Sequence, residues 1–396
     1  MRELSEPPGQ AVRSLPVPKS HLPTLKLLTP PFDDWTTVEP DSDAERVLTS
    51  RLEQMLGAER LMVLTGLGTS TGIHGDGSGA NGPGMEALWA RAKNAAGEEQ
   101  WAKALGMAGW SSAFPEDIEH LLSRCQMAHT LNSSGGLDQF IALCEREIVA
   151  ACSFISDTTP LPIHESFLRR IARRPSRLPR TQIFTTNYDL AFEVAASRTG
   201  FALIDGFSHV LPQRFDSSYF DVDYAFRDRE RAATPVEWMR NVVHLLKLHG
   251  SVDWIAKEGG VERQRDPDRP LIIYPRTSKF EISYQQPFLE LMARFQAGLR
   301  RPDTALFVIG SGLGADQHLA EPIRAAARSN VRLSMVVVSR SLSSKEGATV
   351  DALRAYAAGG DRRVTLIEST FEDFVPVLPD LVPETEAEKH AGLIES

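Results

Sequence analysis

Several short apolar runs end in glycine or small polar residues, and this pattern most constrains the fold. Examples are RLMVLTGLG from residue 60, TQIFTTNYD from 181, VVHLLKLHG from 242 and TALFVIGSGLG from 304. They are continuously apolar rather than alternating, as strands covered on both faces of a sheet are. Helical patterns such as QQPFLELMARFQAGL and LAEPIRAAARS separate some of them. The alternation predicts an α/β fold: a Rossmann-like, doubly wound, mostly parallel sheet with helices on both faces.

The remaining runs and the stretches between them divide the chain. Further strands are expected near residues 201–207, 270–275, 331–339 and 363–370. A helix is expected after Asp41 or Ser42, either of which suits the capping position. In chain order, we predict a proline-rich N-terminal arm, a Rossmann-like nucleotide-binding domain in two pieces with a helical insertion between them, and a polar C-terminal tail. Their bounds are 1–40 for the arm, 41–84 and 175–378 for the domain, 85–174 for the insertion and 379–396 for the tail.

The expected insertion has an apolar stripe at helical spacing. Such a stripe is typical of a packed core, so the chain's three cysteines, which all lie on it, are predicted to be packing residues. They form no C-x-x-C pair, and the sequence therefore indicates neither a disulfide framework nor a zinc ribbon. The stripe comprises Ile118, Leu121, Leu122, Cys125, Phe140, Cys144, Ile148, Cys152 and Ile155.

Charge and hydropathy exclude several classes of protein. The net charge of −9 argues against a general nucleic-acid binder. The basic run RRIARRPSRLPR at 169–180 has two interpretations, a nucleic-acid contact or a solvated helix face, and the acidic total favours the second. The N-terminus lacks the apolar core of a signal peptide, and no apolar run approaches the ~18 residues of a membrane span. We therefore expect a cytoplasmic protein with no membrane association.

The first predicted strand leads into a glycine-rich loop. In doubly wound sheets, ligands bind beyond the carboxyl ends of the strands, and glycines there let backbone N–H groups approach a phosphate. The loop offers Gly66, Gly68, Thr69 and Ser70. Its spacing misses G-x-G-x-x-G by one residue, so a plain flexible loop is the alternative interpretation.

Other strand ends carry polar groups expected at the same edge. One ends in Thr186, Asn187 and Asp189, where the amide and carboxylate either face a ligand or merely form a turn and cap a helix. Another ends in His249, which is either a core histidine or an acid/base residue. Two more strands end in a second glycine-rich loop and in a serine. These contribute Gly310, Ser311, Gly312 and Ser339.

The ordered set of strand ends resembles the sirtuin family. Sirtuins carry a G-A-G-x-S loop, then T-Q-N-x-D, then an H-G motif and a glycine- and serine-rich loop. The counterparts here are Gly66–Ser70, Thr185–Asp189, His249-Gly250 and Gly310–Leu313, so the resemblance spans residues 55 to 375. The four zinc-binding cysteines of the family's deacylases have no counterpart, because no cysteine lies between His249 and Gly310. No zinc is expected.

The segment PLIIYPRTSKFEISYQQPFLELM from residue 270, followed by IGSGLGADQHL from residue 309, is similar to divergent sirtuin-like domains of bacterial anti-phage systems, whereas the missing zinc module and the helical insertion depart from the deacylases. That resemblance implies an NAD glycohydrolase, with NAD as substrate and nicotinamide and ADP-ribose as products. It also implies gating, because an unregulated NADase would kill its host. The expected partners are further copies of the chain and a HerA-type ATPase. Two alternatives stay open: an NAD or ADP-ribose sensor without turnover, and a zinc-less protein deacylase.

The resemblance also implies roles for the residues at the strand ends. The first glycine loop would hold the diphosphate of NAD. Asn187 would position the ribose or the attacking water, Asp189 would lie near the carboxamide, and His249 would act as general base or as partner of a ribose hydroxyl. These three are the expected catalytic residues. The expected NAD-binding residues are Gly66, Gly68, Thr69, Ser70, Thr186, Gly310, Ser311, Gly312 and Ser339. The last three of these would contact the adenosine end.

Overall fold

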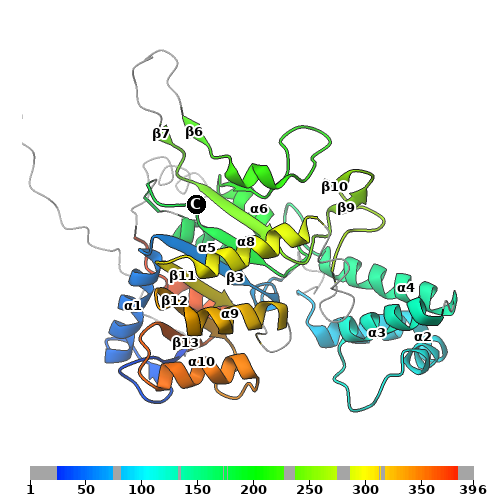
Figure 1. Cartoon of the computed structure of the whole chain (residues 1–396), viewed down its shortest axis with the longest axis horizontal. Helices are drawn as coiled ribbons and strands as arrows, with labels where there is room; N and C mark the ends of the chain where they lie inside the picture. The colour runs from blue at the N-terminus through cyan, green and yellow to red at the C-terminus, as the bar shows by residue number, and fades with distance from the viewer. Residues whose placement is uncertain are drawn as a thin grey trace, which may run out of the picture.

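A computed structural model describes most of the chain. The described residues are 25–74, 82–132, 135–172, 174–175, 177–226, 237–273, 286–311, 313 and 317–381. They form a nine-stranded sheet covered by helices, with further helices grouped beside it (Figure 1). This confirms the predicted α/β, Rossmann-like fold with a mostly parallel sheet.

Seven of the nine strands form a continuous parallel array. In spatial order these are β5 (Ala202–Ile204), β8 (Val242–Lys247), β4 (Gln182–Thr185), β3 (Arg60–Thr65), β11 (Thr304–Ile309), β12 (Leu333–Ser339) and β13 (Val364–Glu368). Two strands from the start of the described chain, β1 (Leu25–Leu28) and β2 (Thr36–Val38), continue the sheet antiparallel beyond β13.

The strand order places a topological switch point between β3 and β11. After β3 the chain forms β4, then β5 at the edge of the sheet and then β8 between β4 and β5, before it crosses over to β11 on the other side of β3. The neighbours β3 and β11 pair along their whole length, with Thr65 opposite Ile309. The carboxyl ends of two strands that flank such a point are where α/β sheets bind ligands.

Alternate residues of the central strands face two separate cores. Val63 and Phe307 pack with one set of helices, namely α1 (Asp43–Leu56), α5 (Pro162–Ala172), α6 (Ala191–Arg198) and α11 (Phe371–Phe374). Leu64 and Val308 pack with α8 (Phe288–Arg300), α9 (Gln317–Ser329) and α10 (Ala348–Ala358). Burial on both faces explains why these strands read as unbroken apolar runs. Ser42 caps α1 by accepting a hydrogen bond from the Glu45 N–H at 3.1 Å, as its sequence indicated.

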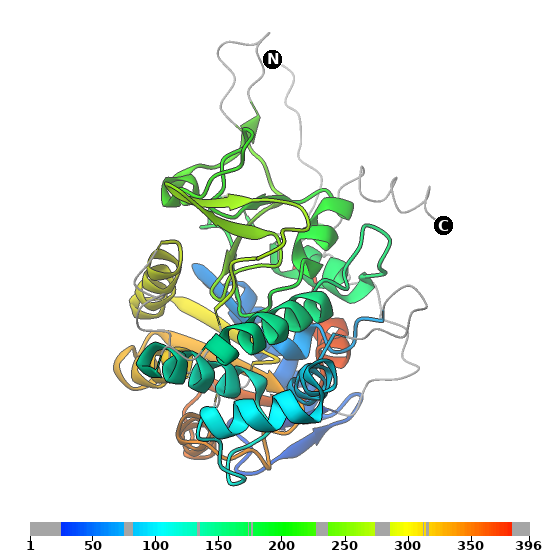
Figure 2. The same cartoon turned by 90° about the vertical axis from the view of Figure 1, so that its right-hand side faces the viewer.

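Three helices between β3 and β4 form a module with its own core. They are α2 (Met85–Met107), α3 (Ile118–Asn132) and α4 (Gly135–Cys152), and they lie together beside the sheet (Figures 1 and 2). The Trp89 and Trp101 rings meet edge to face at 4.9 Å in this core, which also buries Cys125 and Cys144. Burial raises the pKa of both thiols to about 12, so they are packing residues, as predicted. Ile155, the last member of the predicted stripe, lies beyond the end of α4.

Several elements differ from the sequence prediction. Residues 25–38 of the expected arm form β1 and β2, because the edge of β13 offers unpaired backbone groups that a returning segment can satisfy. Helix α5, expected in the insertion, packs Phe167 and Ile171 into the core of the sheet instead. The expected strand at 270–275 makes only an isolated bridge at Ile272, and residues 274 and 275 lie outside the described set.

Small elements complete the fold. They are the short helices η1 (Leu67–Thr69), η2 (Ser217–Asp221) and η3 (Val375–Val377), and two hairpins, β6 (Ala225–Phe226) with β7 (Glu237–Trp238) and β9 (Trp254–Lys257) with β10 (Gly260–Arg263). Within the described ranges, no helix has the length and apolar character needed to cross a bilayer. Residues 1–24 of the expected arm and 382–396 of the expected tail lie outside those ranges.

Candidate functional site

The two glycine loops at the switch point pack backbone against backbone. The Gly66 N–H donates to the Ile309 carbonyl at 3.1 Å, and the Gly68 N–H donates to the Gly310 carbonyl at 2.9 Å. A Cβ on Gly68 would lie 2.6 Å from the Gly310 Cα, and Gly310 itself has a φ of +62°. These glycines are required by close approach of the two loops and, at Gly310, by a left-handed backbone.

The backbone donors of the first loop are already used within the protein. Besides the two bonds to the β11 loop, the Thr69 N–H donates to Gly66 and the Ser70 N–H to Leu67, both at 2.9 Å. The loop therefore closes into the turn η1, and in this state it does not present a row of N–H groups to a phosphate. The prediction that it cradles a diphosphate remains a prediction, and side-chain groups would have to share that role.

Substituting Gly68 tests how tightly the loops are joined. We expect Gly68→Ala to destabilise the protein by about 1–3 kcal/mol, because the new methyl group forces the Gly310 backbone away. Gly84→Ala is the matched control, since a Cβ there meets nothing within 4 Å. Thermal unfolding of both variants measures the difference. Equal melting temperatures would show that the loops move apart at no cost.

Beyond β4, a buried cluster of side chains joins the next strand end to the first loop. The Asn187 Nδ2 lies 3.1 Å from the Thr69 Oγ1 and 2.8 Å from the Ser70 Oγ, and the Ser70 Oγ lies 2.7 Å from the Asp189 Oδ2. All four residues are at most 9% exposed. The sequence places Asn187 and Asp189 more than a hundred residues from this loop, and the β3–β4 pairing brings them together.

The directions of these hydrogen bonds fix the orientation of the Asn187 amide. An ionised carboxylate only accepts, so the Ser70 hydroxyl donates to Asp189 and its oxygen accepts from Asn187. The Thr69 hydroxyl donates to the Gly66 carbonyl at 2.9 Å and likewise accepts from Asn187. Both contacts therefore require the amide nitrogen on this side. The amide oxygen of Asn187 is turned away from the two hydroxyls.

Asp189 also has the structural role that its sequence position allowed. Its Oδ1 accepts a hydrogen bond from the Ala191 N–H, at the first residue of α6, at 3.0 Å. With one oxygen on the helix and the other on Ser70, the carboxylate positions the cluster. This contact fits the interpretation of Asp189 as a turn-forming residue, whereas the N-cap position of α6 is occupied by Leu190 without a side-chain cap. The predicted place of Asp189 near a carboxamide stays a prediction.

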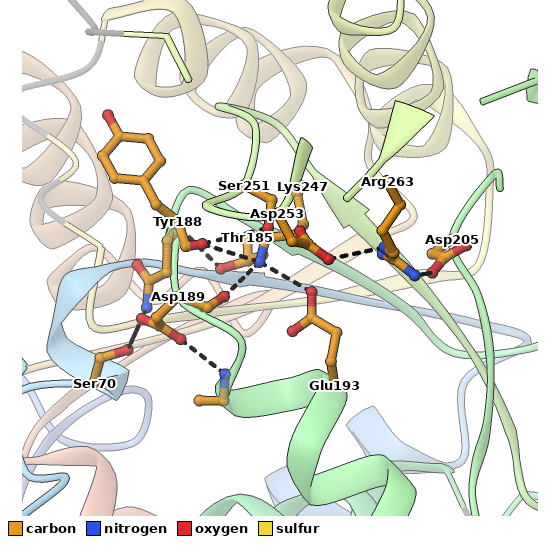
Figure 3. A network of polar contacts seen from close by, with 12 residues as sticks. Ser70, Thr185, Tyr188, Asp189, Glu193, Asp205, Lys247, Ser251, Asp253 and Arg263 are labelled. Atoms are coloured by element: carbon orange, nitrogen blue, oxygen red, sulfur yellow. Dashed lines mark hydrogen bonds and ion pairs between the residues drawn. The ribbon is translucent and has the colours of Figure 1, made fainter. Parts of the chain in front are cut away.

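A buried lysine holds the same turn from β8. Lys247 is 2% exposed, and its Nζ donates to the backbone carbonyls of Tyr188 and Asp189 and to the Glu193 carboxylate at 3.0 Å (Figure 3). Burial raises the pKa of Glu193, and the ammonium of Lys247 acts against that rise. Lys247 was not among the residues predicted from the sequence, although a charged side chain within a buried strand must be paired.

The polar network continues outward from this lysine toward β10. The Arg263 guanidinium lies 2.9 Å from Asp205 and 2.9 Å from Asp253, as Figure 3 shows. It also stacks over the Phe207 ring at 4.7 Å. Asp253 follows the His249-Gly250-Ser251 turn, so this ion-pair cluster fixes the segment immediately after the predicted histidine.

His249 lies at the carboxyl end of β8, next to the Asn187 turn. It is 4% exposed, and the Leu248 N–H just before it donates to the Thr185 carbonyl at 2.8 Å. Gly250 has a φ of +87°, and a Cβ there would lie 2.1 Å from the Leu271 carbonyl oxygen. The glycine permits the sharp turn that the sequence suggested. The two readings of His249, core residue or acid/base, both fit this burial.

A second histidine lies behind the cluster. His164 of α5 is 2% exposed and meets the Phe192 and Phe371 rings edge to face at 5.1 Å each. Burial lowers its pKa to about 4, although Asp189 acts in the opposite direction. It is therefore a neutral core histidine near neutral pH, and the sequence did not single it out.

The other predicted residues are also at the carboxyl edge of the sheet. The Thr186 N–H donates to the Thr65 carbonyl at 3.1 Å, and Ser311 lies against Gly66. Ser339 ends β12, and its carbonyl accepts from the Ser369 N–H at 3.1 Å. Gly312 lies outside the described residues. In the part of the chain that the structure describes, no cluster of three or more His, Cys, Asp or Glu side chains is arranged to hold a metal.

A family model matches part of the sheet on both sides of the switch point. Residues 181–355 match the model of the SIR2-like domain. The match includes Asn187, His249 and Gly310, and it excludes the first glycine loop and the helices α2, α3 and α4. No curated protein matches the chain.

Solved structures add little to this result. One of those found is cytosolic 5'-nucleotidase IIIB bound to cytidine, at 10% identity, covering 89% of this chain and 93% of that one. Its TM-score of 0.28 is too low to indicate a shared fold. Residues 181–355, which run from just before β4 into α10 and include Asn187, His249 and Gly310, are therefore similar to a SIR2-like domain.

Proposed function

We propose that the chain is an NAD glycohydrolase whose active site lies at the carboxyl ends of β3, β4, β8 and β11. The observation that carries the proposal is the oriented Asn187 amide, held by Thr69 and Ser70 at the switch point of the sheet. The match to a SIR2-like domain supports NAD as the ligand of this edge.

The chemistry requires one water and one leaving group. Water attacks the anomeric carbon of the nicotinamide ribose as the glycosidic bond breaks, and the products are nicotinamide, ADP-ribose and a proton. The transition state resembles an oxocarbenium ion. With its nitrogen occupied by two hydroxyls, Asn187 presents its amide oxygen to accept a hydrogen bond from the water or from a ribose hydroxyl. That contact places the water for attack.

In this proposal, His249 accepts the proton as general base. A neutral imidazole nitrogen can accept a proton from water or from a ribose hydroxyl. The buried turn at Gly250 keeps the ring at the edge of the sheet next to the Asn187 turn. The hydroxyls of Thr69, Ser70 and Ser311 and the groups of Thr186, Gly310, Gly312 and Ser339 are proposed to line the rest of the NAD site.

Nicotinamide release from NAD by the purified chain tests the proposal. We expect release by the parental chain and a loss of about a hundredfold or more in His249→Ala, the range found when an acid/base residue is removed. Tight NAD binding without release would indicate a sensor instead. Formation of O-acetyl-ADP-ribose from an acetylated peptide would indicate a deacylase. Parental turnover in His249→Ala would remove this histidine from the mechanism.

The role in defence and the partners are part of the same proposal. An enzyme that exhausts NAD must be held inactive in a healthy cell, so we propose that self-association or a HerA-type ATPase switches it on. The support is the sirtuin-like resemblance of the chain together with this physical need. Nicotinamide release should be measured with the chain alone, at high concentration, and with the ATPase added. Equal rates in all three would argue against gating.

A further inference from the structure

One residue joins the candidate site to the core of the helical module. Tyr188 lies between Asn187 and Asp189 in the turn after β4, yet its buried ring belongs to the core formed by α2, α3 and α4. Val252 and Ile272, from the segments that follow His249, enter the same core. The module therefore packs directly on the two turns that carry the proposed catalytic groups.

The hydroxyl of Tyr188 contacts both the module and the second turn. It lies 3.1 Å from the Glu119 Oε1 of α3 and 2.9 Å from the Ile273 carbonyl oxygen. The Ile273 N–H in turn donates to the His249 carbonyl at 2.8 Å. The single proton of this phenol is shared between two acceptors, one on helix α3 and one on Ile273, whose N–H pairs with the backbone of His249.

The backbone of Tyr188 is a second junction. Its carbonyl accepts from the Val252 N–H at 3.1 Å, from the Ser251 hydroxyl at 3.4 Å and from the Lys247 Nζ at 3.4 Å (Figure 3). A shift of the Tyr188 ring therefore moves Asn187 on one side and the His249 turn on the other. Reacting groups displaced by ~1 Å typically lose about a hundredfold in rate.

We propose that Tyr188 is a positioning residue through which the helical module, by way of Glu119, sets the relative placement of Asn187 and His249. The proposal rests on the proposed NAD hydrolysis for its kinetic test, but the coupling itself is a property of the fold. A ligand or partner that shifts α3 would then change turnover without touching NAD.

Two conservative variants test the link, with a third as control. Tyr188→Phe removes the hydroxyl and keeps the ring in its core, and Glu119→Gln keeps the shape of its partner. Tyr224→Phe is the matched control, because its hydroxyl also makes a hydrogen bond, to the His209 Nε2 at 2.7 Å, in a different part of the molecule.

We expect Tyr188→Phe to lower kcat about tenfold with KM for NAD unchanged, and Glu119→Gln to act in the same direction. The double variant should be no slower than Tyr188→Phe alone.

Hydrogen exchange supplies a readout that does not depend on turnover. We expect faster amide exchange in residues 185–192 and 248–253 of Tyr188→Phe and Glu119→Gln, and parental exchange there in Tyr224→Phe. A chain without NAD hydrolysis would refute the proposed function, while exchange would still decide the coupling. Parental exchange in both turns, or a lower melting temperature with unchanged kcat and exchange, would overturn the role of Tyr188.

Discussion

Asn187→Ala is expected to lower NAD hydrolysis by about a hundredfold or more while leaving the fold intact. The amide nitrogen is held by Thr69 and Ser70, so the amide oxygen is presented in one orientation, and its loss leaves the attacking water unplaced. The measurement is the initial rate of nicotinamide release at saturating NAD, beside circular dichroism of the variant.

Asn187→Asp tests whether the orientation of the side chain at this position matters apart from its size. The carboxylate has nearly the same shape, but it cannot donate to the Ser70 oxygen, so we expect a loss comparable to that of the alanine variant. The matched control is Asn330→Ala, whose amide donates to the Leu299 and Arg301 carbonyls at 2.9 Å, beyond α9 and before β12. If Asn187→Ala turned over NAD at the parental rate, Asn187 would have no place in the mechanism.

Lys247→Met is expected to destabilise the protein by about 3–5 kcal/mol, because it leaves the Glu193 carboxylate buried without its cation. Two backbone carbonyls, of Tyr188 and Asp189, lose their donor at the same time. Chemical denaturation measures the change. The control is Lys26→Met, which breaks an ion pair of similar length, 3.1 Å, in which the lysine is 47% exposed; its effect should be small.

The deficit of Lys247→Met should depend on pH in one direction. Burial already raises the pKa of Glu193, and removal of Lys247 raises it further. A folded-state pKa above the unfolded value favours folding at low pH, and this contribution disappears as pH rises through the folded pKa. The variant should therefore lose least stability in mild acid and most above neutrality. Adding Glu193→Gln should restore stability and abolish this dependence; an unchanged deficit at all pH values would contradict the pairing.

The parallel core of the sheet was predictable because its strands are buried on both faces. Runs such as Val242–Lys247 and Thr304–Ile309 consist mainly of apolar residues, and this composition indicates that both faces of the strand are covered. The same logic placed Asn187, His249 and Gly310 at one edge, since parallel strands end on the same side. Strands β1 and β2 were missed because both are short, because β2 is an edge strand, and because β1 pairs with β13, more than three hundred residues away.

The contacts within the site could not be predicted from the sequence, for a different reason. The Ser70 hydroxyl orients an amide and meets a carboxylate, contacts that the sequence did not indicate, while its predicted place near the diphosphate stays a prediction. The sequence analysis assigned no role to Tyr188, whose ring enters a separate core. The sequence pattern identifies which side chains lie at the same edge of the sheet. Which of them bond to each other depends on turn geometry that local sequence does not encode.

The interlocked glycine loops have a consequence for how the protein is made. Gly68 leaves the ribosome early, and the Gly310 backbone on which it packs is synthesised only after the helical module and most of the sheet. A domain that emerges in this order cannot complete its site while the chain is still short. The nascent polypeptide therefore lacks the joined loops until Gly310 has been synthesised. For the proposed NAD hydrolase, this order of synthesis would protect the NAD of the cell during translation.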